Sequence, residues 1–484
     1  MTATPLPLAP QHEDPAAEGD RWRERDLAVL WHPCTQMHDH TAVDGPRLPL
    51  TPIARGEGVW LVDHAGRRYL DAISSWWTNL FGHANARIGA AIKDQVDRLE
   101  QVIFAGFSHE PAIRLAEELL RVAPRGLARV FYADNGSSAI EVALKMSFHF
   151  WTNQGGRNQS GRTHSASNAR RPRKTRFVAL SGGYHGETLG ALSVTDVPLY
   201  RATYAPLLGS PIFVASPDCH ERAEGDDWRT HSLRLLAEMR ATLARHADEV
   251  CAVIVEPLVQ CAGGMRMYHP AYLAGLRALC DEFDVHLIAD EIAVGFGRTG
   301  TLFACEQAQI TPDFLCLSKG LTGGFLPLSA VLTRQSIYDA FYAEYSSGKA
   351  FLHSHSYTGN PLACRAALET LAIFRDEPVL ERNRVLAAHL AARLAPLAAH
   401  PNVSEVRQTG MIAAVELVQT RQPRTPFAAA ERRGIRVYLH ALAHGVLLRP
   451  LGDVIYFMPP YVITLEEIDC MVDAAVAAIE HAVA

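Results

Sequence analysis

Short apolar runs that each end in a polar residue are the feature that most constrains this chain's fold. The most informative pair lies in residues 285–319, where one run ends at Asp290 and the next ends at Ser318 and Lys319. Earlier runs of the same kind cover residues 128–134, 177–181 and 251–256. Their length and aliphatic composition predict buried strands. The helical segments between them predict parallel pairing through right-handed crossovers, and so an α/β fold.

The residues at the ends of these runs are candidates for a single site, because ligands bind beyond the carboxyl ends of such strands. The candidates are Ser137, Tyr184, Glu256, Asp290 and Lys319. A lysine and a carboxylate at one sheet edge suit pyridoxal phosphate. The amine can form a Schiff base, and the carboxylate can pair with the protonated pyridine nitrogen.

Two loops beside these strands have features of a phosphate site and a ring site. Gly136 and Ser137 follow a strand and open a helix, where backbone N–H groups and the helix dipole attract anions. A simple N-cap without a ligand is the alternative. Tyr184 stands between glycines, which suits stacking on a flat ligand, although a turn with a core tyrosine would have the same sequence.

Adjacent tryptophans at positions 76 and 77 cannot share one face of a strand or helix. One of them can pack in the core while the other faces a cleft. The alternative is that both are core or interface residues, since tryptophan is usually highly buried.

The length of 484 residues exceeds one core of usual size, so we expect more than one domain. Residues 74–360 are expected to form a large domain with a mostly parallel sheet and helices on both faces. Residues 21–73 and 361–484 are expected to form a smaller α+β domain. Residues 1–20 have the proline and acid content of a disordered lead, and residues 152–175 are typical of a flexible polar insertion.

Composition excludes several classes of protein. The net charge of −6 opposes general nucleic-acid binding, and the basic run at residues 170–174 is typical of a solvated loop. Nine scattered cysteines without a CxxC pair indicate a reduced, cytoplasmic protein. The sequence contains no apolar run long enough for a membrane helix, and its first residues lack the pattern of a signal peptide.

Two rival sites are less consistent with the sequence. Residues 295–300 match GxGxxG, a fingerprint of NAD-dependent dehydrogenases, but the following segment is short and Asp313 precedes the next strand instead of ending it. Metal binding would have to use His32, Cys34, His38 and His40, or His353 and His355. Neither set has a recognised ligand spacing, so no metal site is expected.

From about Leu30 to the C-terminus, the longer motifs resemble those of class III (fold type I) pyridoxal-phosphate aminotransferases. The stretches YHGET, DEIxxGFGRTG and SKGLTGG are similar to those that specify this class. SSWW together with the late LRPLGDVIYFMPPY resembles the members that act in biotin biosynthesis. Further matching stretches are WHPCTQM, DNGSSAIEVALK, VEPLVQCAGGM and HSHSYTGNPLAC.

The resemblance implies a role for each matching residue around the cofactor. Lys319 would form the Schiff base and shuttle the proton, Asp290 would pair with the pyridine nitrogen, and Tyr184 would stack on the ring. Gly136 and Ser137 would bind the phosphate, together with Ser356 from the other subunit of a homodimer. The implied cofactor set also includes His185, Glu256 and His355.

The resemblance also implies the substrates, with S-adenosylmethionine as amino donor and 8-amino-7-oxononanoate as acceptor. The implied substrate-binding residues are Cys34, Trp76, Trp77, Tyr184, Lys319, Ser354 and Arg449, with Arg449 on the carboxylate of the oxo acid. The chain departs from the family at two places. Cys34 stands where some members have Tyr, and residues 354–356 are Ser-His-Ser where some have Gly-Pro-Thr. Lysine as the donor, or the reaction of another class III ω-aminotransferase, are the alternatives.

Overall fold

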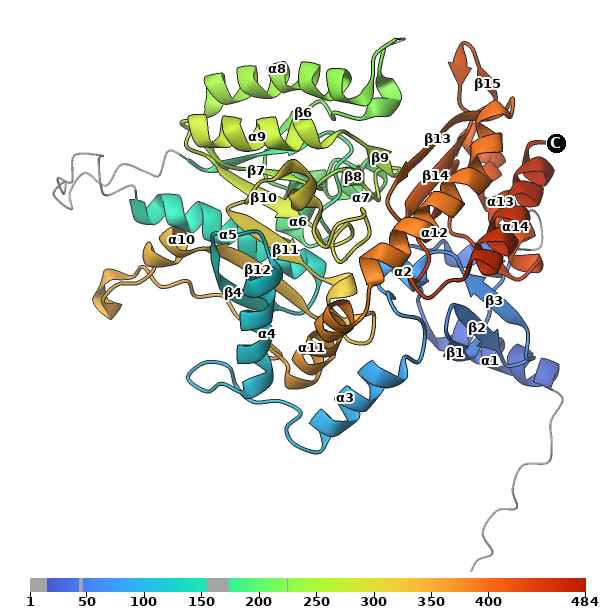
Figure 1. Ribbon diagram of the computed structural model, residues 1–484, viewed down its shortest axis with the longest axis horizontal. Coiled ribbons are helices and arrows are strands. Elements are labelled where there is room, and N and C mark those ends of the chain that lie inside the picture. Colours follow the sequence, from blue (N-terminus) through green and yellow to red (C-terminus); the bar gives the residue numbers. More distant parts are fainter. Residues whose placement is uncertain (1–14, 43–46, 155–173, 224) are drawn as a thin grey trace, which may run out of the picture.

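A seven-stranded sheet forms the centre of the larger part of the molecule (Figure 1). The computed structural model describes residues 15–42, 47–154, 174–223 and 225–484. Across the sheet, the strands follow the order β4 (Leu127–Ala133), β12 (Ser329–Arg334), β11 (Phe314–Leu317), β10 (His286–Asp290), β7 (Val250–Val255), β5 (Arg176–Leu180) and β6 (Ile212–Val214). Only β12 runs against its neighbours, and the other strands are parallel to one another. The prediction of a mostly parallel α/β sheet is confirmed.

Helices cover both faces of this sheet because alternate residues of each strand point to opposite faces. On β7, Ala252 and Ile254 pack in a core cluster with the buried face of α5 (Gly136–Gln154). Val253 and Val255 pack in the other cluster, with the buried face of α9 (Pro270–Glu282). Both sets of residues are fully buried, which explains why these strands are continuously apolar in the sequence. Figure 1 shows α8 (Trp228–His246) beside α9, away from α5.

The remaining part of the molecule combines segments from the two ends of the chain (Figure 1). One antiparallel sheet contains β13 (Val403–Thr409), β14 (Ile412–Leu417) and β18 (Val454–Phe457). A second sheet contains β1 (Ile53–Glu57), β2 (Trp60–Asp63) and β3 (Arg68–Asp71), with β17 (Val446–Leu447) parallel to β3. The helices here are α12 (Val379–Leu394), α13 (Arg433–Ala443) and α14 (Leu465–Val483). This is the smaller α+β part that the sequence predicts.

Four further helices connect these two parts or lie at the edge of the large sheet. They are α3 (Ala86–Val96), α4 (Glu110–Val122), α10 (Gln335–Asp339) and α11 (Pro361–Asp376). Helix α11 packs on α3 and α4, close to the large sheet in Figure 1. The expected domain boundary at residue 361 therefore precedes a helix that lies with the larger part, and the domain limits remain a prediction.

Regular elements overlap the ends of two segments that the sequence predicts to be irregular. Helix α1 (Pro15–Val29) includes residues 15–20 of the expected disordered lead, and the rest of the lead lies outside the described residues. The last turn of α5 includes residues 152–154, and residues 174–175 lead into β5. Residues 155–173 lie outside the described part of the chain. The amine of Lys174, the last residue of the basic run, is 3.8 Å from the centroid of the Trp151 ring.

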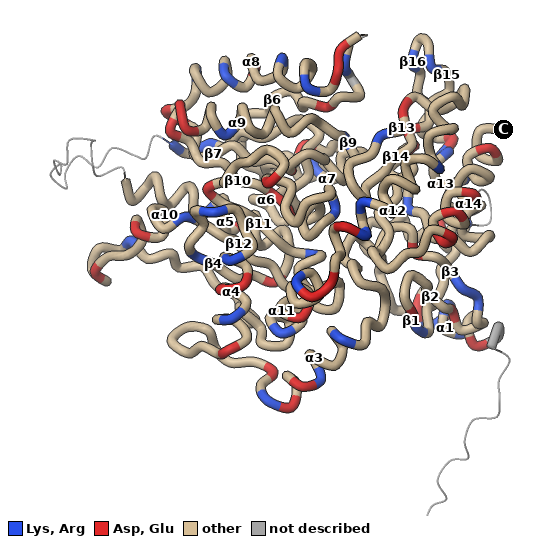
Figure 2. The backbone as a smooth tube through the Cα atoms, viewed as in Figure 1, with Lys and Arg blue, Asp and Glu red and all other residues tan. Residues whose placement is uncertain are grey.

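Charged residues of both signs are interspersed along the described elements (Figure 2). Within the described ranges, no helix is long and apolar enough to cross a membrane.

Candidate active site

A cavity of about 370 Å³ lies at the carboxyl ends of the central strands. It forms where the chain leaves β4, β5, β7, β10 and β11, which is where ligands bind in sheets of this type. Its walls include Trp77, Gly136, Ser137, Tyr184, His185, Glu256, Asp290 and Lys319. The structure thus brings together the strand-end residues singled out in the sequence.

Asp290 is the last residue of β10, and its carboxylate is nearly inaccessible to solvent. One carboxylate oxygen lies 2.8 Å from Nδ1 of His185, and the other accepts the N–H of Ile292 at 3.1 Å. The His185 backbone N–H donates to Oγ1 of Thr195 at 2.9 Å, which helps to hold the histidine in place. A buried carboxylate that is fixed from two sides can provide a negative charge at a defined position in the cavity.

Lys319 follows β11 and begins the short 3-10 helix η6 (Lys319–Thr322) with a left-handed φ of +46°. Few non-glycine residues adopt this conformation, and such strained residues are often found at functional sites. Its amine is 4.4 Å from the centroid of the Trp77 ring. Burial lowers the pKa of this amine, and the nearby Cys261, Asp290 and Glu256 oppose that effect. A lower pKa increases the share of neutral amine, which is the nucleophilic form.

Glu256 follows β7 and connects two walls of the cavity. Its carboxylate accepts the N–H of Tyr184 and the N–H of Cys261, both at 2.9 Å. Burial raises the pKa of Glu256 to about 7, with His185 opposing and Asp290 reinforcing the shift. The carboxylate therefore fixes the positions of the loops before Tyr184 and after Val259.

The N-terminus of α5 forms a cradle for an anion. Asn135 accepts the N–H of Ser138 at 3.0 Å, whereas the first N–H groups of a helix, here those of Gly136 and Ser137, have no intrahelical partner. Ser137 Oγ accepts the N–H groups of Glu187 and Thr188 at 3.1 and 3.0 Å. This hydroxyl therefore connects the helix to the loop that carries Tyr184.

Gly186 makes this connection possible. Its φ is +127°, and a Cβ atom at this position would lie 2.3 Å from Ser137 Oγ. A residue with a side chain would therefore push Ser137 out of the cradle.

Tyr184 lines the cavity and contacts Glu187 of the same wall. Its hydroxyl donates to Glu187 Oε1 at 2.8 Å, and its ring meets the ring of Tyr200 edge to face at 5.4 Å. Burial and the hydrogen bond to Glu187 raise the pKa of the Tyr184 phenol well above its usual value. The phenol is therefore protonated near neutral pH.

Three residues that the sequence places far apart meet beside Glu187 of the cavity wall, and we call this region the mouth of the cavity. The Arg449 guanidinium is 4.9 Å from the centroid of the Trp76 ring, and its Nη2 is 3.4 Å from the carbonyl oxygen of Cys34. Burial raises the pKa of the Cys34 thiol; Glu187 adds to this effect and Arg449 opposes it. Cys34, Trp76 and Arg449 therefore form one group beside Glu187.

Sequence reasoning missed two residues of this mouth, Glu187 and Tyr200. Glu187 lines the cavity and accepts the Tyr184 hydroxyl. Tyr200 belongs to the short helix α7 (Pro198–Arg201), and its half-buried ring packs on Tyr184. Glu187 could have been found because it follows Tyr184 in the same glycine-rich turn. No sequence pattern points to Tyr200.

Residues 354–356 are not brought to this cavity by their own chain. They lie in the loop between η7 (Tyr345–Ser347) and α11, and they are absent from the described lining of the cavity. The carbonyl of Ser356 accepts a hydrogen bond from Gln101 Nε2 at 2.9 Å. The preceding His353 lies 2.8 Å from the amine of Lys145 on α5.

The glycine cluster at 295–300 does not form a nucleotide loop. It forms buried turns and is followed by the short 3-10 helix η5 (Ala304–Ala308) instead of a long helix. Within it, the buried Arg298 donates to the carbonyls of Pro459 at 2.7 Å and Asn79 at 3.1 Å. The cluster thus connects the large sheet to the C-terminal part. Among the described residues, no group of three or more His, Cys, Asp or Glu is arranged to hold a metal ion.

The fold and the cavity define a pyridoxal-phosphate-dependent enzyme, because a lysine, a fixed carboxylate and an anion cradle surround one pocket. The sequence pattern of the family described as aminotransferase class-III matches residues 42–479. The chain belongs to this family, and it is a pyridoxal-phosphate-dependent transaminase.

Similar proteins extend the comparison over nearly the whole chain. The chain is 47% identical to the adenosylmethionine-8-amino-7-oxononanoate aminotransferase of Helicobacter pylori over 92% of its length and 94% of that protein. It is 44% identical to the protein of that name from Geobacter sulfurreducens, over 93% and 95%.

Solved structures agree with these sequence similarities. The crystal structure of the enzyme of the same name from Methanocaldococcus jannaschii has a TM-score of 0.86 and 36% identity, over 96% of this chain and 99% of that one. An omega transaminase from Pseudomonas jessenii, in complex with PMP, has a TM-score of 0.86 and 30% identity, over 95% and 97%.

Proposed function

We propose that this enzyme transfers the amino group of S-adenosylmethionine to 8-amino-7-oxononanoate and so forms 7,8-diaminononanoate in biotin biosynthesis. The observation that carries the proposal is the group of Arg449, Trp76 and Cys34 at the mouth of the lysine pocket. A guanidinium stacked on an indole can bind the carboxylate at the far end of a long oxo acid, while the acid's keto group reaches Lys319. The names of the bacterial relatives support the same substrates.

The residues of the pocket fit the cofactor in distinct roles. Gly136 and Ser137 would hold the phosphate, Tyr184 would cover the ring, and Asp290 with His185 would hold the pyridine nitrogen. When bound, pyridoxal phosphate supplies an electron sink and carries the amino group between the two substrates. The Gly186 cradle supports this assignment, because the loop is built to bring Ser137 close without a side chain between them.

The protein's own part in the reaction is to move one proton and to exclude water. With the cofactor bound, the Lys319 amine would take the proton from the amino-bearing carbon of the donor and return it to the cofactor side of the substrate. With the acceptor, the same amine would move the proton in the opposite direction. Burial lowers the pKa of this amine and so increases the share of the neutral form, which can accept the proton. Trp77, buried beside it, keeps water away from the amine.

We further propose that two copies of the chain form the working enzyme, with Ser354, His355 and Ser356 of each completing the phosphate site of the other. The contact between His353 and Lys145 supports this proposal, because it holds the loop next to α5. A largely apolar cavity of about 630 Å³, which Phe148, Phe351 and Leu352 help to line, lies on the same surface. The Leu352 side chain is 88% exposed in the single chain, and a second copy would cover it.

We also propose a cytoplasmic location for the enzyme. All nine cysteines fall within the described residues, and each is a free thiol. This supports a reducing compartment.

The reaction itself is tested with purified holoenzyme, S-adenosylmethionine and 8-amino-7-oxononanoate. Mass spectrometry should detect the diamine, and its amount should follow enzyme concentration. If the diamine forms only when lysine replaces S-adenosylmethionine, the amino donor is lysine. The absence of diamine with either donor would contradict the proposed function.

A further inference from the structure

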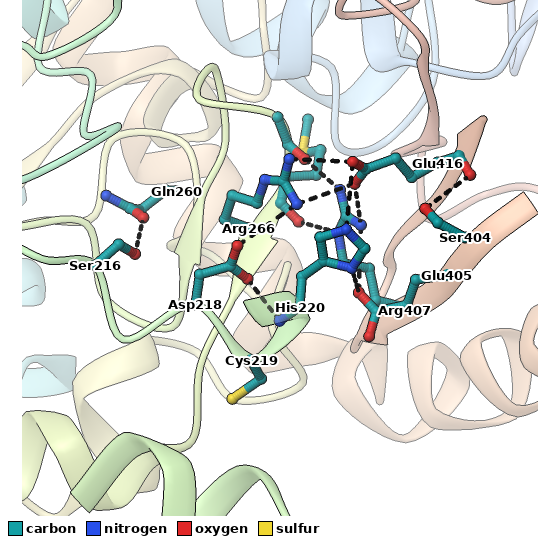
Figure 3. A network of polar contacts seen from close by, with 12 residues as sticks. Ser216, Asp218, Cys219, His220, Gln260, Arg266, Ser404, Glu405, Arg407 and Glu416 are labelled. Atoms are coloured by element: carbon teal, nitrogen blue, oxygen red, sulfur yellow. Dashed lines mark hydrogen bonds and ion pairs between the residues drawn. The ribbon is translucent and has the colours of Figure 1, made fainter. Parts of the chain in front are cut away.

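A buried group of charges connects the two parts of the molecule (Figure 3). We call it the bridging cluster, and it consists of Asp218, His220, Arg266, Glu405, Arg407 and Glu416. Asp218 directly precedes η4 (Cys219–Glu221), and His220 lies in η4. Arg266 lies in β9 (Arg266–Met267), beside the large sheet. Glu405 and Arg407 lie on β13, and Glu416 lies on β14 of the C-terminal sheet.

His220 lies between the two glutamates. Its Nδ1 is 2.9 Å from Glu405 Oε2, its Nε2 is 3.4 Å from Glu416 Oε1, and its ring is almost fully buried. Arg222 and Arg424 also contact this site, at Glu405 and at His220 respectively. Burial alone would lower the pKa of His220, but the hydrogen bonds with the two glutamates raise it. This raised pKa widens the pH range in which the imidazolium form is present.

Arg407 is the most deeply buried member of the cluster, with a side chain that is 1% exposed. It donates to Glu416 at 2.7 Å and also to the carbonyls of Met265 at 2.7 Å and Gly264 at 2.6 Å. Arg266 contacts Glu416 at 3.0 Å and Asp218 at 3.5 Å. The guanidinium of Arg407 thus holds the turn before β9 directly against the C-terminal sheet.

Such a cluster is poorly explained by stability alone. Removing several charges from water costs about as much as their mutual attraction returns, so buried ion pairs contribute little net stability. What they do fix is geometry, since each charged group tolerates few arrangements of its partners. The cluster therefore fixes the positions of the elements on either side of it.

On one side, the cluster continues into the cofactor wall. The turn that Arg407 holds belongs to a hairpin of β8 (Val259–Gln260) and β9, which starts just after Glu256. Within it, the N–H of Cys261 donates to Glu256, whose other oxygen holds the N–H of Tyr184. A Cβ atom on Gly263 would lie 2.0 Å from the carbonyl oxygen of Gly182, so the hairpin also touches the loop before Tyr184.

On the other side, the cluster continues to Arg449. Glu416 pairs with Val454 across strands β14 and β18. Val454 and Leu451 exchange both backbone hydrogen bonds, at 2.9 and 3.0 Å, in a tight turn. Arg449 stands two residues before Leu451, at the mouth of the cavity.

We propose that the bridging cluster positions Arg449 relative to the cofactor pocket, and that His220, Arg407 and Glu416 are positioning residues for the acceptor substrate. This inference rests on the proposed function, in which Arg449 binds the carboxylate of the oxo acid. The donor half of the reaction depends on Lys319 and the cofactor wall. Glu256 holds that wall by its own hydrogen bonds with the N–H groups of Tyr184 and Cys261, so the donor half is less sensitive to the position of the C-terminal sheet. Loosening the cluster therefore weakens acceptor binding and leaves the donor half-reaction nearly unchanged.

The test uses His220→Gln and Glu416→Gln in the holoenzyme, with two half-reactions measured separately by the visible absorbance of the bound cofactor. Couplings of this kind predict a rise of about threefold to tenfold in the acceptor concentration needed for half-saturation. The donor half-reaction should stay within about twofold of wild type. His389→Gln is the matched control, because His389 contacts Asp469 at 2.7 Å between α12 and α14 and has no part in the cluster.

The outcomes separate this inference from the proposed function. If unmodified enzyme does not react with 8-amino-7-oxononanoate, the proposed function fails and this inference fails with it. If unmodified enzyme reacts and both variants match it, or lose both halves equally, the positioning role is wrong. A rise of the same size for His389→Gln in the acceptor concentration needed for half-saturation would also overturn the positioning role.

A measurement on unmodified holoenzyme covers the case in which both variants fail to fold. Hydrogen exchange in residues 256–267 and 412–417 should slow when the acceptor is added. Unchanged exchange there would contradict the inference.

Discussion

At the scale of single residues, the corner at Ser74–Trp77 (α2) shows how the chain separates two neighbouring tryptophans. Ser74, Ser75 and Trp77 all have left-handed φ values, between 51° and 67°. Asp71 holds the corner by accepting the N–H of Ser75 at 2.6 Å. Trp77 is 4% exposed and Trp76 is 39% exposed. The sequence predicts that the two rings separate. It does not predict the left-handed backbone that separates them, because no sequence pattern marks this conformation in residues other than glycine.

Gly186→Ala should weaken cofactor binding, because the new methyl group would collide with Ser137 at the phosphate cradle. We expect a loss of at least about tenfold in affinity for pyridoxal phosphate, which corresponds to about 1.4 kcal/mol. Absorbance titration of the apoenzyme with the cofactor measures this loss.

Gly182→Ala is the control for Gly186→Ala. Gly182 also has a positive φ, of +71°, but a Cβ atom there meets nothing within 4 Å. The control should show only the strain of a left-handed alanine, about 1 kcal/mol in stability. Equal losses of affinity in both variants would show that the contact with Ser137 is unimportant.

Arg449→Ala should mainly weaken use of the oxo acid. Loss of a charge-assisted hydrogen bond to a carboxylate costs about 1.5–3 kcal/mol, or roughly tenfold to a hundredfold in affinity. Half-reaction kinetics with each substrate should show this loss for the acceptor only. Equal losses for donor and acceptor would count against the role proposed for Arg449.

At the scale of elements, the buried strands and the residues that end them could be read from the sequence. Five strand-end residues from Ser137 to Lys319 line one cavity, because parallel strands end at the same edge of the sheet. The antiparallel direction of β12 could not be predicted, because a strand's own residues do not determine its direction. The bridging cluster was also hidden, because its charges come from elements that are nearly 200 residues apart, as His220 and Glu416 are.

Glu405→Gln should remove stability that depends on pH. Burial alone would raise the pKa of Glu405, but hydrogen bonds from His220 and Arg222 lower it to about 2. A lowered pKa contributes stability that is present above the unfolded value of about 4.5 and is lost as pH falls toward about 2. We expect the variant to lose roughly 3 kcal/mol at pH 7 and to become less sensitive to acid in this window.

Thermal unfolding between pH 2 and pH 7 measures the effect of Glu405→Gln. Glu282→Gln, which breaks the exposed pair of Glu282 with Arg240, is the control and should change the acid sensitivity far less, because solvent screens exposed ion pairs. His220 has a raised pKa, so its contribution is present in full below about pH 6.5 and is lost as pH rises through the folded value. A Glu405→Gln protein with wild-type acid sensitivity would contradict this account.

At the scale of the whole molecule, one chain contains the lysine pocket and its mouth, while residues 354–356 do not line that pocket. We therefore predict a homodimer in solution whose dissociation lowers affinity for the cofactor. Sedimentation at decreasing protein concentration, followed by cofactor titration, measures both quantities. A fully active monomer would contradict the proposal that residues from the other subunit complete the site.

The most direct test of the account follows the visible absorbance of the bound cofactor through both halves of the reaction. The pyridoxal form is mixed in turn with S-adenosylmethionine, lysine, glutamate and 4-aminobutyrate, and Lys319→Ala serves as the blank. The account predicts that S-adenosylmethionine removes the absorbance and that 8-amino-7-oxononanoate then restores it. Loss of absorbance with only glutamate or 4-aminobutyrate, or no recovery with the oxo acid, would contradict the account.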